Sequence, residues 1–562
     1  MKKIICLLTM LVLAETGLAQ NPTSVPISHP VYHFLDRMET TGILDNILDG
    51  VKPFDRGHIA ELLKVVESQR ERLSAIDQRV LDNYLLDFRF EIDPTQKYAR
   101  IDNNSNIYSP FSSLNNLKAD FLRFFARNDP EEDNHLFLWE DSTNSFYLDF
   151  NYDVTYDQRS DDVSRSKEIM TFEARGSLTS QFGYMAQVSL ANIHGDYEYR
   201  NQDPYLKKTW RNNRENVTYF DRSSGDIGLH TPWVDLHFAI QPTTWGVGES
   251  GILILSDNVE QYPYLSISKR WGWGNFVFMH GKLLAEQSGQ TEEGQKIYPD
   301  KWIAGNRFEF SPWSGMAIAL TGLIVYGNRS ADWTYLFPIN YFRAGEHNLR
   351  DRDNALISLD LEWRIFNGLK VYGTLFLDEL RKDKIGTDWY GNKQAFQAGL
   401  HLADPLGIDN FSVHAEYVAV MPWVYTHKYS INRFTNDSLS LGHWAGPNSE
   451  VIYFHIEKRF SRRLNTGIKL WQWKHGRNYP NENIGGDIML GHNTLLGDQE
   501  EARETRKFLE GILETEKKAE FYADYELFNG FFIRLKAAAI HYQNPSEEQK
   551  LSEMHIGLGL EY

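Results

Sequence analysis

The chain has 562 residues, of which 14% are aromatic, and a formal net charge of -18. Such an acidic surface disfavours nucleic acid as a partner. The mean hydropathy is -0.47, and no run of about 18 apolar residues follows residue 19, which excludes a membrane-spanning helix. Two classes remain: a large soluble β protein, or a transmembrane β-barrel, whose strands alternate lipid-facing and lumen-facing side chains and so escape hydropathy averages.

The first 19 residues have the pattern of a cleavable secretory signal. Lys2 and Lys3 precede an apolar run, and the small residues Gly17 and Ala19 precede Gln20. Residues 1–19 are therefore predicted to be removed on export. The single cysteine, Cys6, lies inside this segment, so we expect neither disulfides nor a lipid anchor in the mature chain.

Residues 27–95 show the spacing of amphipathic helices. Val31, Phe34, Leu35 and Met38 recur at helical intervals, and the pattern repeats in the stretch "FDRGHIAELLKVVES". This part is predicted to be a small helical domain. Residues 96–143 are compatible with a plug, a linker or extra periplasmic strands.

From about Asn144 the period of the apolar residues changes to two. In residues 356–377 one face is apolar and the other mostly polar, on both sides of an Asn-Gly turn. A three-residue loop, Phe366-Asn367-Gly368, keeps the faces in agreement by pairing Trp363 with Val371 and Ile365 with Leu369.

The same turn design, x-x-Gly, recurs in three more predicted hairpins. One closes on Phe528-Asn529-Gly530 and pairs Tyr525 with Ile533. A second closes on Trp313-Ser314-Gly315. A third closes on Gln181-Phe182-Gly183, with Leu178, Gly176 and Ala174 opposite Ala186, Val188 and Leu190.

The tight turns fall on one side of the predicted sheet and the long polar segments on the other, as in outer-membrane barrels. The long segments are 195–228, 286–300, 326–354, 379–395, 421–449 and 474–518. Strict up-and-down order then requires one more crossing between 242 and 262. The stretch "GILILS", Gly251–Ser256, is the candidate strand, after a tight turn at Trp245–Gly248. With a strand at 229–241, the predicted barrel of 144–562 has about eighteen strands, and both chain ends face the periplasm.

Two stretches resemble the Wzi capsule assembly family. "HPVYHFLDRMETTGIL...VKPFDRGHIAELL" is similar to its N-terminal part, which S-layer-homology modules share. "WGVGESGILILSDNVEQYPYL" resembles its Trp-Gly-x-Gly...Leu-Ile-Leu-Ser signature. The signature positions are Trp245, Gly246, Gly248, Leu253 and Ser256. The resemblance implies an eighteen-stranded outer-membrane barrel with a periplasmic helical bundle, acting as a lectin that holds capsular or exopolysaccharide.

The predicted loops are rich in residues that suit sugars, because aromatic rings stack on the apolar faces of pyranoses while polar groups bind hydroxyls. The candidates are Trp333, Tyr335, Asp388, Trp389, Tyr390, Trp423, Tyr425, His443 and Trp444. The alternative for each aromatic residue is the interfacial girdle that any membrane barrel has.

Catalysis has little support in the sequence. No G-x-S-x-G or H-E-x-x-H motif occurs, and the strand positions of His280, His401, His414 and His455 favour a structural role. We expect no enzyme activity, cofactor or metal. Mixed charges on the predicted inward faces, such as Asp360 and Arg364, indicate a blocked lumen. The run Gln499–Lys518 alternates in charge and predicts a surface helix.

The sequence therefore predicts an all-β outer-membrane barrel that binds and anchors surface polysaccharide. The alternative is a channel for solutes or polysaccharide. Expected partners are outer-membrane lipid, surface polysaccharide and the barrel assembly machinery. The helical domain is expected in the periplasm, where packing on the barrel mouth is favoured over contact with peptidoglycan.

Overall fold

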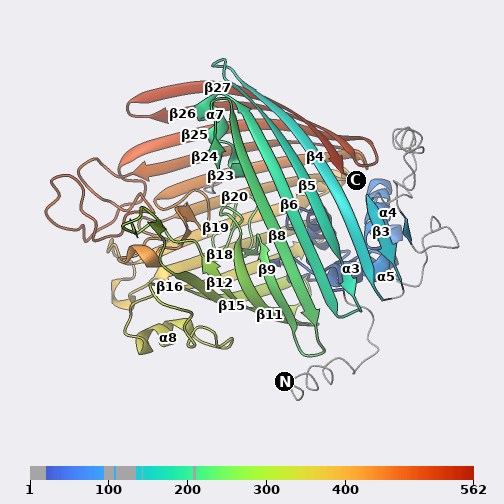
Figure 1. Ribbon diagram of the computed structural model, residues 1–562, viewed down its shortest axis with the longest axis horizontal. Helices are drawn as coiled ribbons and strands as arrows, with labels where there is room; N and C mark the ends of the chain where they lie inside the picture. The colour runs from blue at the N-terminus through green and yellow to red at the C-terminus, as the bar shows by residue number, and fades with distance from the viewer. Residues whose placement is uncertain (1–20, 94–106, 109–134, 142, 207–210, 562) are drawn as a thin grey trace.

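The computed structural model describes residues 21–93, 107–108, 135–141, 143–206 and 211–561. Within these residues, eighteen antiparallel strands close into a barrel (Figure 1). They are β4 (Ser145–Arg159), β5 (Ser164–Leu178), β6 (Phe182–Gly195), β8 (Val217–His230), β9 (Asp235–Gln241), β11 (Tyr262–Trp271), β12 (Gly274–Leu283), β15 (Lys301–Trp313), β16 (Met316–Gly327), β17 (Asn354–Phe366), β18 (Leu369–Glu379), β19 (Lys393–Ala403), β20 (Phe411–Val420), β23 (Ser449–Ser461), β24 (Leu464–Arg477), β25 (Ile512–Phe528), β26 (Phe531–Asn544) and β27 (Glu547–Glu561).

Shorter strands and helices lie outside the set of eighteen barrel strands. The strands are β1 (Val51–Lys52), β2 (Ile107–Tyr108), β3 (Phe137–Glu140), β7 (Asn212–Asn213), β10 (Thr244–Trp245), β13 (Gly289–Gln290), β14 (Lys296–Ile297), β21 (Thr435–Asn436) and β22 (Leu439–Ser440). The helices are α2 (Val31–Thr40), α3 (Arg56–Ser68), α4 (Ala75–Asp87), α5 (Arg89–Ile92), α7 (Tyr197–Asn201) and α8 (Phe342–Asn348). None of the described helices is long and apolar enough to cross a bilayer.

The barrel closes where β27 pairs with β4, with Leu558 opposite Val154. Side chains alternate as the sequence predicts: Leu361 and Trp363 are exposed on the outer wall, whereas Asp360 lies buried inside and pairs with Arg307. The long connections gather at one end, which we call the long-loop end, although the β4–β5 and β26–β27 turns there are short.

Three of the four predicted hairpin turns are present. Tyr525 lies opposite Ile533, and Trp363 lies opposite Val371. Ile365 does not pair with Leu369 as predicted, because a bulge after Arg364 brings Phe366 opposite Leu369. The glycines of these turns, Gly315, Gly368 and Gly530, have positive φ.

The prediction for the hairpin at Gln181-Phe182-Gly183 is wrong in register. Its loop is 179–181, and Leu178 pairs with Phe182 rather than with Ala186. Thr179, not Gly183, takes the left-handed conformation, with φ of 64°. The loop lies two residues earlier than predicted, so the pairing shifts by four residues on one strand. Because four is an even number, the faces still agree, and the apolar pattern alone could not detect the error.

The strand count is confirmed, but one member of the predicted set is wrong. β8 (Val217–His230) lies mostly within the predicted polar segment 195–228, and the predicted strand 229–241 is the end of β8, a turn and β9. Residues 251–256, predicted to be a strand, form no barrel strand. Trp245–Gly248 is likewise not one of the tight turns at the end opposite the long-loop end. The predicted helix at Gln499–Lys518 is also absent, because β25 already begins at Ile512.

The helical domain, α2 to α5 with its own apolar core, sits at the end of the barrel opposite the long loops (Figure 1). It contacts the tight turns directly. Gly368 donates its amide hydrogen to Thr40 O at 2.8 Å, and Arg37 forms an ion pair of 2.8 Å with Asp404. The predicted position on the side of the tight turns is therefore confirmed. The predicted signal peptide and most of residues 96–143 lie outside the described residues.

Candidate functional site

The segment 242–261, between β9 and β11, folds into the lumen of the barrel instead of adding a strand to its wall. Its short strand β10 pairs with β1 of the helical domain, with Trp245 opposite Val51. The Gly246 amide donates to Gly50 O at 2.7 Å. The segment thus starts at the long-loop end and descends through the lumen to the helical domain.

Glycines allow this segment to turn back tightly. A Cβ atom on Gly248 would lie 2.1 Å from the carbonyl oxygen of Gly251 and 2.3 Å from Gln397 Nε2. Gly246 has φ of 114°, a conformation that L side chains rarely adopt. The two signature glycines are therefore required by backbone geometry.

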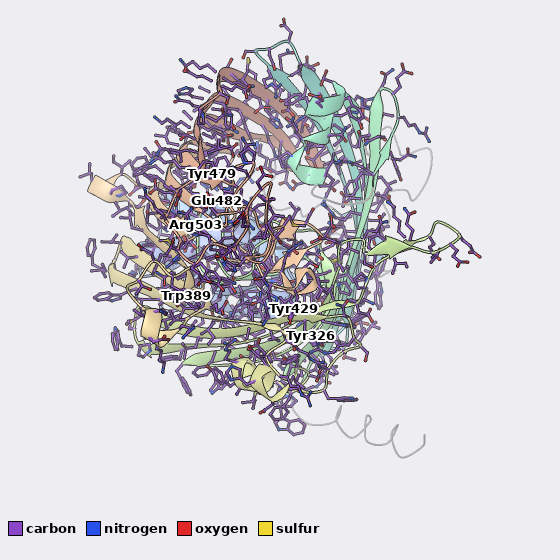
Figure 2. The ribbon with its side chains drawn as sticks, turned by 90° about the vertical axis from the view of Figure 1, so that its left-hand side faces the viewer. Tyr326, Trp389, Tyr429, Tyr479, Glu482 and Arg503 are labelled. Atoms are coloured by element: carbon purple, nitrogen blue, oxygen red, sulfur yellow. The ribbon has the colours of Figure 1, made fainter. Side chains whose placement is uncertain are left out.

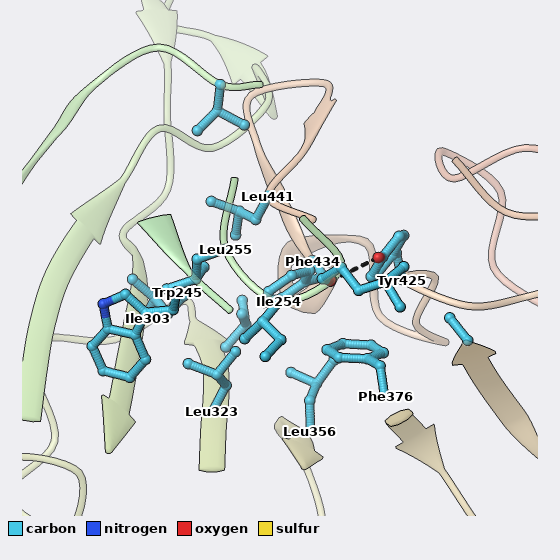
Figure 3. Close-up of a cluster of buried hydrophobic side chains, with 14 of the residues drawn as sticks. Trp245, Ile254, Leu255, Ile303, Leu323, Leu356, Phe376, Tyr425, Phe434 and Leu441 are labelled. Atoms are coloured by element: carbon cyan, nitrogen blue, oxygen red, sulfur yellow. Dashed lines mark hydrogen bonds between the residues drawn. The ribbon is translucent and has the colours of Figure 1, made fainter. Parts of the chain in front are cut away.

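The apolar part of the segment forms a core inside the lumen. Trp245, Leu253, Ile254 and Leu255 are buried, and they pack with Phe376 and other side chains that point inward from the strands and loops (Figure 3). Consecutive apolar residues suit a segment that is surrounded on all sides. This explains why "GILILS" has the sequence of a buried strand although it is not part of the barrel wall.

The upper part of the segment is tied to the loop 421–448. The hydroxyl of Tyr425 donates to Leu253 O at 2.8 Å, and that of Ser256 donates to Gly442 O at 2.6 Å. Asn258 donates to Ser440 O at 3.0 Å. These bonds fix the polar residues Ser256 and Asn258 at the long-loop end of the lumen.

A cavity of about 580 Å³ lies at this position, where three loops meet. Its lining residues are Asn201, Gln202, Asp203, Pro204, Arg211, Glu249, Ser250, Gly251, Ser256, Asp257, Asn258, Leu439 and Trp444. The volume falls within the about 300–1,000 Å³ that is usual for ligand sites. We call it the loop cavity.

The loop cavity combines hydroxyl, amide and charged groups with one aromatic ring. The ring belongs to Trp444, which is 42% exposed and donates its indole Nε1–H to Ser250 O at 2.7 Å. Since the indole is oriented by that bond, its face can receive an apolar surface while the polar lining bonds hydroxyl groups. This arrangement suits a sugar.

The other predicted sugar-contacting residues lie elsewhere. Tyr335, Trp423, Tyr425 and His443 are fully buried, so they offer no surface to a sugar in this structure. The pKa of His443 falls to about 3 because the ring is buried, and its Nδ1 accepts the Ala445 amide hydrogen at 3.2 Å. Trp333 is 87% exposed, but it belongs to the loop 328–353, away from the loop cavity.

Asp388, Trp389 and Tyr390 lie where two further loops interlock. The Tyr390 ring is stacked on His492, and the Arg506 amide donates to Asp388 O at 2.7 Å. Figure 2 looks onto this end of the barrel and shows Trp389 on the same side as Tyr479, Glu482 and Arg503. These residues join loops to one another outside the loop cavity.

Sequence reasoning identified Trp444 but missed most of the polar lining. Asn201, Gln202 and Arg211 come from the segment 195–228, which carries no motif. Ser256, Asp257 and Asn258, which belong to the stretch that resembles the family signature, provide one side of the cavity.

Three of the four strand histidines form a row across the lumen. The ring centroids of His401 and His414 are 4.0 Å apart, and those of His414 and His455 are 5.6 Å apart. His401 bonds Asp36 of the helical domain at 2.8 Å, and His455 bonds Glu249 at 3.0 Å. The row therefore connects the helical domain with the lumenal segment.

Within the part of the chain that the structure describes, one group of carboxylates comes close enough to hold a metal ion. Oxygens of Glu39, Asp49 and Glu362 lie within 4.8 Å of one another. Lys370 Nζ lies 2.8 Å from Glu39 and 3.5 Å from Glu362, and Lys52 Nζ lies 2.9 Å from Asp49. Each of the three carboxylates is thus already paired with a lysine, which argues against a metal cation there.

Comparison with known proteins gives a family and a fold. The family model of the capsule assembly protein Wzi matches residues 154–552. The solved structure of Wzi from Escherichia coli, described as an outer-membrane, carbohydrate-binding β-barrel involved in group 1 capsule assembly, is 12% identical. The match covers 96% of this chain and 99% of that one, with a TM-score of 0.55.

Two barrels from other bacteria are more distant. OccAB2 of Acinetobacter baumannii is 10% identical over 74% of this chain and 98% of its own, with a TM-score of 0.43. OccD3 (OpdP) of Pseudomonas aeruginosa is 11% identical over 74% and 91%, with a TM-score of 0.42. No curated protein matches the chain.

Proposed function

The chain belongs to the Wzi capsule assembly family, and we propose that it is an outer-membrane β-barrel that binds capsular polysaccharide or exopolysaccharide and anchors it at the cell surface. The loop cavity is the proposed site. The helical domain then lies in the periplasm, because it sits at the end opposite the loop cavity.

The observation that carries this proposal is the position and chemistry of the loop cavity. It lies at the end that an outer-membrane barrel exposes to the medium, and it presents the face of Trp444 beside Ser250, Ser256 and Asn258. Ring stacking combined with hydroxyl and amide groups is the chemistry that recognises sugars. The carbohydrate binding of the E. coli relative agrees with it.

The wider setting follows from the barrel. Its outward side chains, such as Leu359, Phe454 and Phe521, are exposed and apolar, which suits contact with outer-membrane lipid. Insertion would need the barrel assembly machinery. The contacts of the helical domain with the tight turns favour a role in closing the barrel mouth over binding peptidoglycan. We expect no catalytic step.

The competing function is a channel. It is disfavoured by the apolar core that fills part of the lumen around Ile254 and by the helical domain at the opposite mouth. Open outer-membrane pores instead have water-filled interiors.

Binding and conductance distinguish the two functions. Purified full-length protein should retain polysaccharide extracted from the surface of the source bacterium, and should not retain an unrelated neutral dextran. In planar bilayers it should give no large, stable unitary currents. Large stable currents, with no retention of the polysaccharide, would show that the channel is the function and the lectin is not.

A further inference from the structure

The loop between β16 and β17, residues 328–353, packs against the outside of the barrel wall. α8 lies in this loop, outside the strands near β15 and β16 (Figure 1). Tyr335 and Phe342 from the loop are buried against Phe278, Ile324 and other outward side chains of four neighbouring strands. We call residues 328–353 the outer-wall loop.

Polar bonds hold the outer-wall loop in place. The outward side chain of Asn306, in β15, donates to Asn340 O at 2.7 Å. The indole of Trp302 donates to Arg329 O at 3.0 Å. The hydroxyl of Tyr335 donates to Asp353 at 2.7 Å. The loop is therefore bound to the wall through its inner face and is not a free extension.

The outer face of the same loop is apolar. Trp333, Phe337, Ile339 and Tyr341 are 87%, 62%, 78% and 63% exposed. In water, four large apolar side chains exposed within nine residues are unfavourable, since each loses the free energy that burial of its apolar surface would provide. Exposure on this scale marks an interaction surface.

The length of the bare wall below the loop indicates what covers that surface. On β16 the outward side chains are partly or largely exposed up to Leu320, whereas Ile324 and Tyr326 are buried under the loop. From Met316 to Leu320 there are four steps along the strand, about 10 Å along the membrane normal at roughly 3.3 Å per residue and a tilt of about 40°. The apolar band of an outer-membrane barrel is about 25 Å tall.

The outer-wall loop thus covers the wall at the depth where half of the apolar band would otherwise lie. The exposed Trp313 and Trp363 mark the lower edge of that band, as girdle aromatics do. The upper half of the apolar band must then be provided by the outer-wall loop. The outer face of this loop is apolar, as contact with lipid requires. Arg350 and Arg352, exposed at the end of the loop, add positive charge.

We propose that the outer-wall loop is a lipid-binding platform: Trp333, Phe337, Ile339 and Tyr341 insert among the acyl chains of the outer leaflet, and Arg350 and Arg352 contact anionic lipid headgroups. Aromatic and cationic side chains are the usual anchors at this level of a bilayer. This inference rests on the proposed outer-membrane location but not on sugar binding.

The test places a fluorophore on the platform and measures its access to lipid. An environment-sensitive label is attached to Ile339→Cys in the mature protein in nanodiscs; the single native cysteine, Cys6, lies in the predicted signal peptide and does not compete for the label. The matched control is Ile297→Cys, an exposed isoleucine in β14 of the loop 284–300. Brominated lipid should quench the label at 339 at least about twofold more than the label at 297, and aqueous iodide should show the reverse order.

The platform is overturned if iodide quenches the label at 339 as strongly as the label at 297, and brominated lipid does not quench the label at 339. A second arm tests the arginines. Adding phosphatidylglycerol to phosphatidylcholine nanodiscs should increase the quenching by brominated lipid, and R350Q/R352Q should remove that increase. No effect of phosphatidylglycerol on the parent would overturn the headgroup contact.

Polysaccharide binding by the labelled proteins is measured in parallel. Because the platform and the loop cavity share no residue, loss of lipid quenching with intact sugar binding contradicts the platform alone. Intact quenching without sugar binding contradicts the proposed lectin function alone.

Discussion

Trp245 and Leu255 form a reciprocal backbone pair inside the barrel: the Trp245 amide donates to Leu255 O at 2.9 Å, and the Leu255 amide donates to Trp245 O at 3.1 Å. This pair closes the signature of the family into a loop within the lumen. One end of that loop contacts the helical domain through β1, and the other supports the loop cavity. Trp245 and Leu255 therefore support the loop cavity without lining it.

Replacing Trp245 should destabilise the barrel strongly. Trp245→Ala removes a buried indole from the lumenal core, and large-to-small changes of this kind cost about 3–5 kcal/mol. The measurement is the unfolding midpoint in denaturant, followed by the mobility shift of the folded barrel on gels. The control is Trp233→Ala, since Trp233 is 67% exposed in a tight turn. Equal midpoints for the two variants would contradict the packed core.

A methyl group on Gly248 should disturb the site and spare the barrel. The added Cβ would meet the Gly251 carbonyl at 2.1 Å, so residues 249–251 must move. Gly248→Ala is expected to weaken polysaccharide binding at least about tenfold while the protein still inserts as a folded barrel. Gly272→Ala is the control, because no heavy atom beyond Gly272 and its two chain neighbours lies within 4 Å of its Cβ position. Normal binding by Gly248→Ala would show that the lumenal segment does not support the cavity.

Lys370 should be required to hold the helical domain on the barrel. Its ammonium group pairs with Asp36 and, at 2.8 Å, with Glu39 of α2. Lys370→Met leaves these carboxylates without their cation, and breaking a buried ion pair costs about 3–5 kcal/mol. We expect faster proteolysis of residues 27–95 in the purified protein. Lys550→Met, at an exposed position, should leave the rate unchanged. Unchanged proteolysis in Lys370→Met would contradict the ionic attachment.

Docking of the outer-wall loop should depend on pH. Burial raises the pKa of Glu346 to about 7, although Arg343 opposes the shift. The pKa of Glu346 in the folded protein thus lies above its unfolded value of about 4.3. The contribution of Glu346 to the stability of the docked loop is therefore complete below a pH of about 4.3 and is lost as the pH rises through about 7. Hydrogen exchange in residues 328–353, corrected for intrinsic rates, should show more protection at about pH 5.5 than at about pH 8. Glu346→Gln should remove the difference; a difference that persists in this variant would assign it to another group.

Alternation and turn chemistry predicted most of the barrel because each wall strand has two different environments. Tyr525 and Ile533 face lipid while Asp524 and Arg534 face the lumen, and the pattern records this. β8 escaped detection since its outward residues include Asp221, Ser223 and Gly225, which carry no apolar signal.

The lumenal segment was misassigned for the opposite reason. Leu253, Ile254 and Leu255 are all buried, so the run is apolar throughout, as it would be in a fully buried strand. Only the packing of residues distant in sequence, such as Phe376 and Phe434, distinguishes the two cases.

The same limit applies to the site. Among the loop aromatics, Trp423 and Tyr425 are buried whereas Trp444 is exposed, although all three lie in the loop 421–448. Which ring faces a cavity is decided by contacts between loops, and a single sequence does not encode those contacts in any local pattern.

The central claim, that the loop cavity binds surface polysaccharide, is tested most directly by the equilibrium affinity of Trp444 variants. Trp444→Ala removes the ring and should weaken binding about tenfold, equivalent to about 1.4 kcal/mol, which is within the range of an aromatic contact. Trp444→Phe keeps a ring but loses the bond to Ser250 O, so it should fall between Ala and the parent. Trp233→Ala should bind as the parent does. Parental affinity in Trp444→Ala, in a protein that remains folded, would contradict the account.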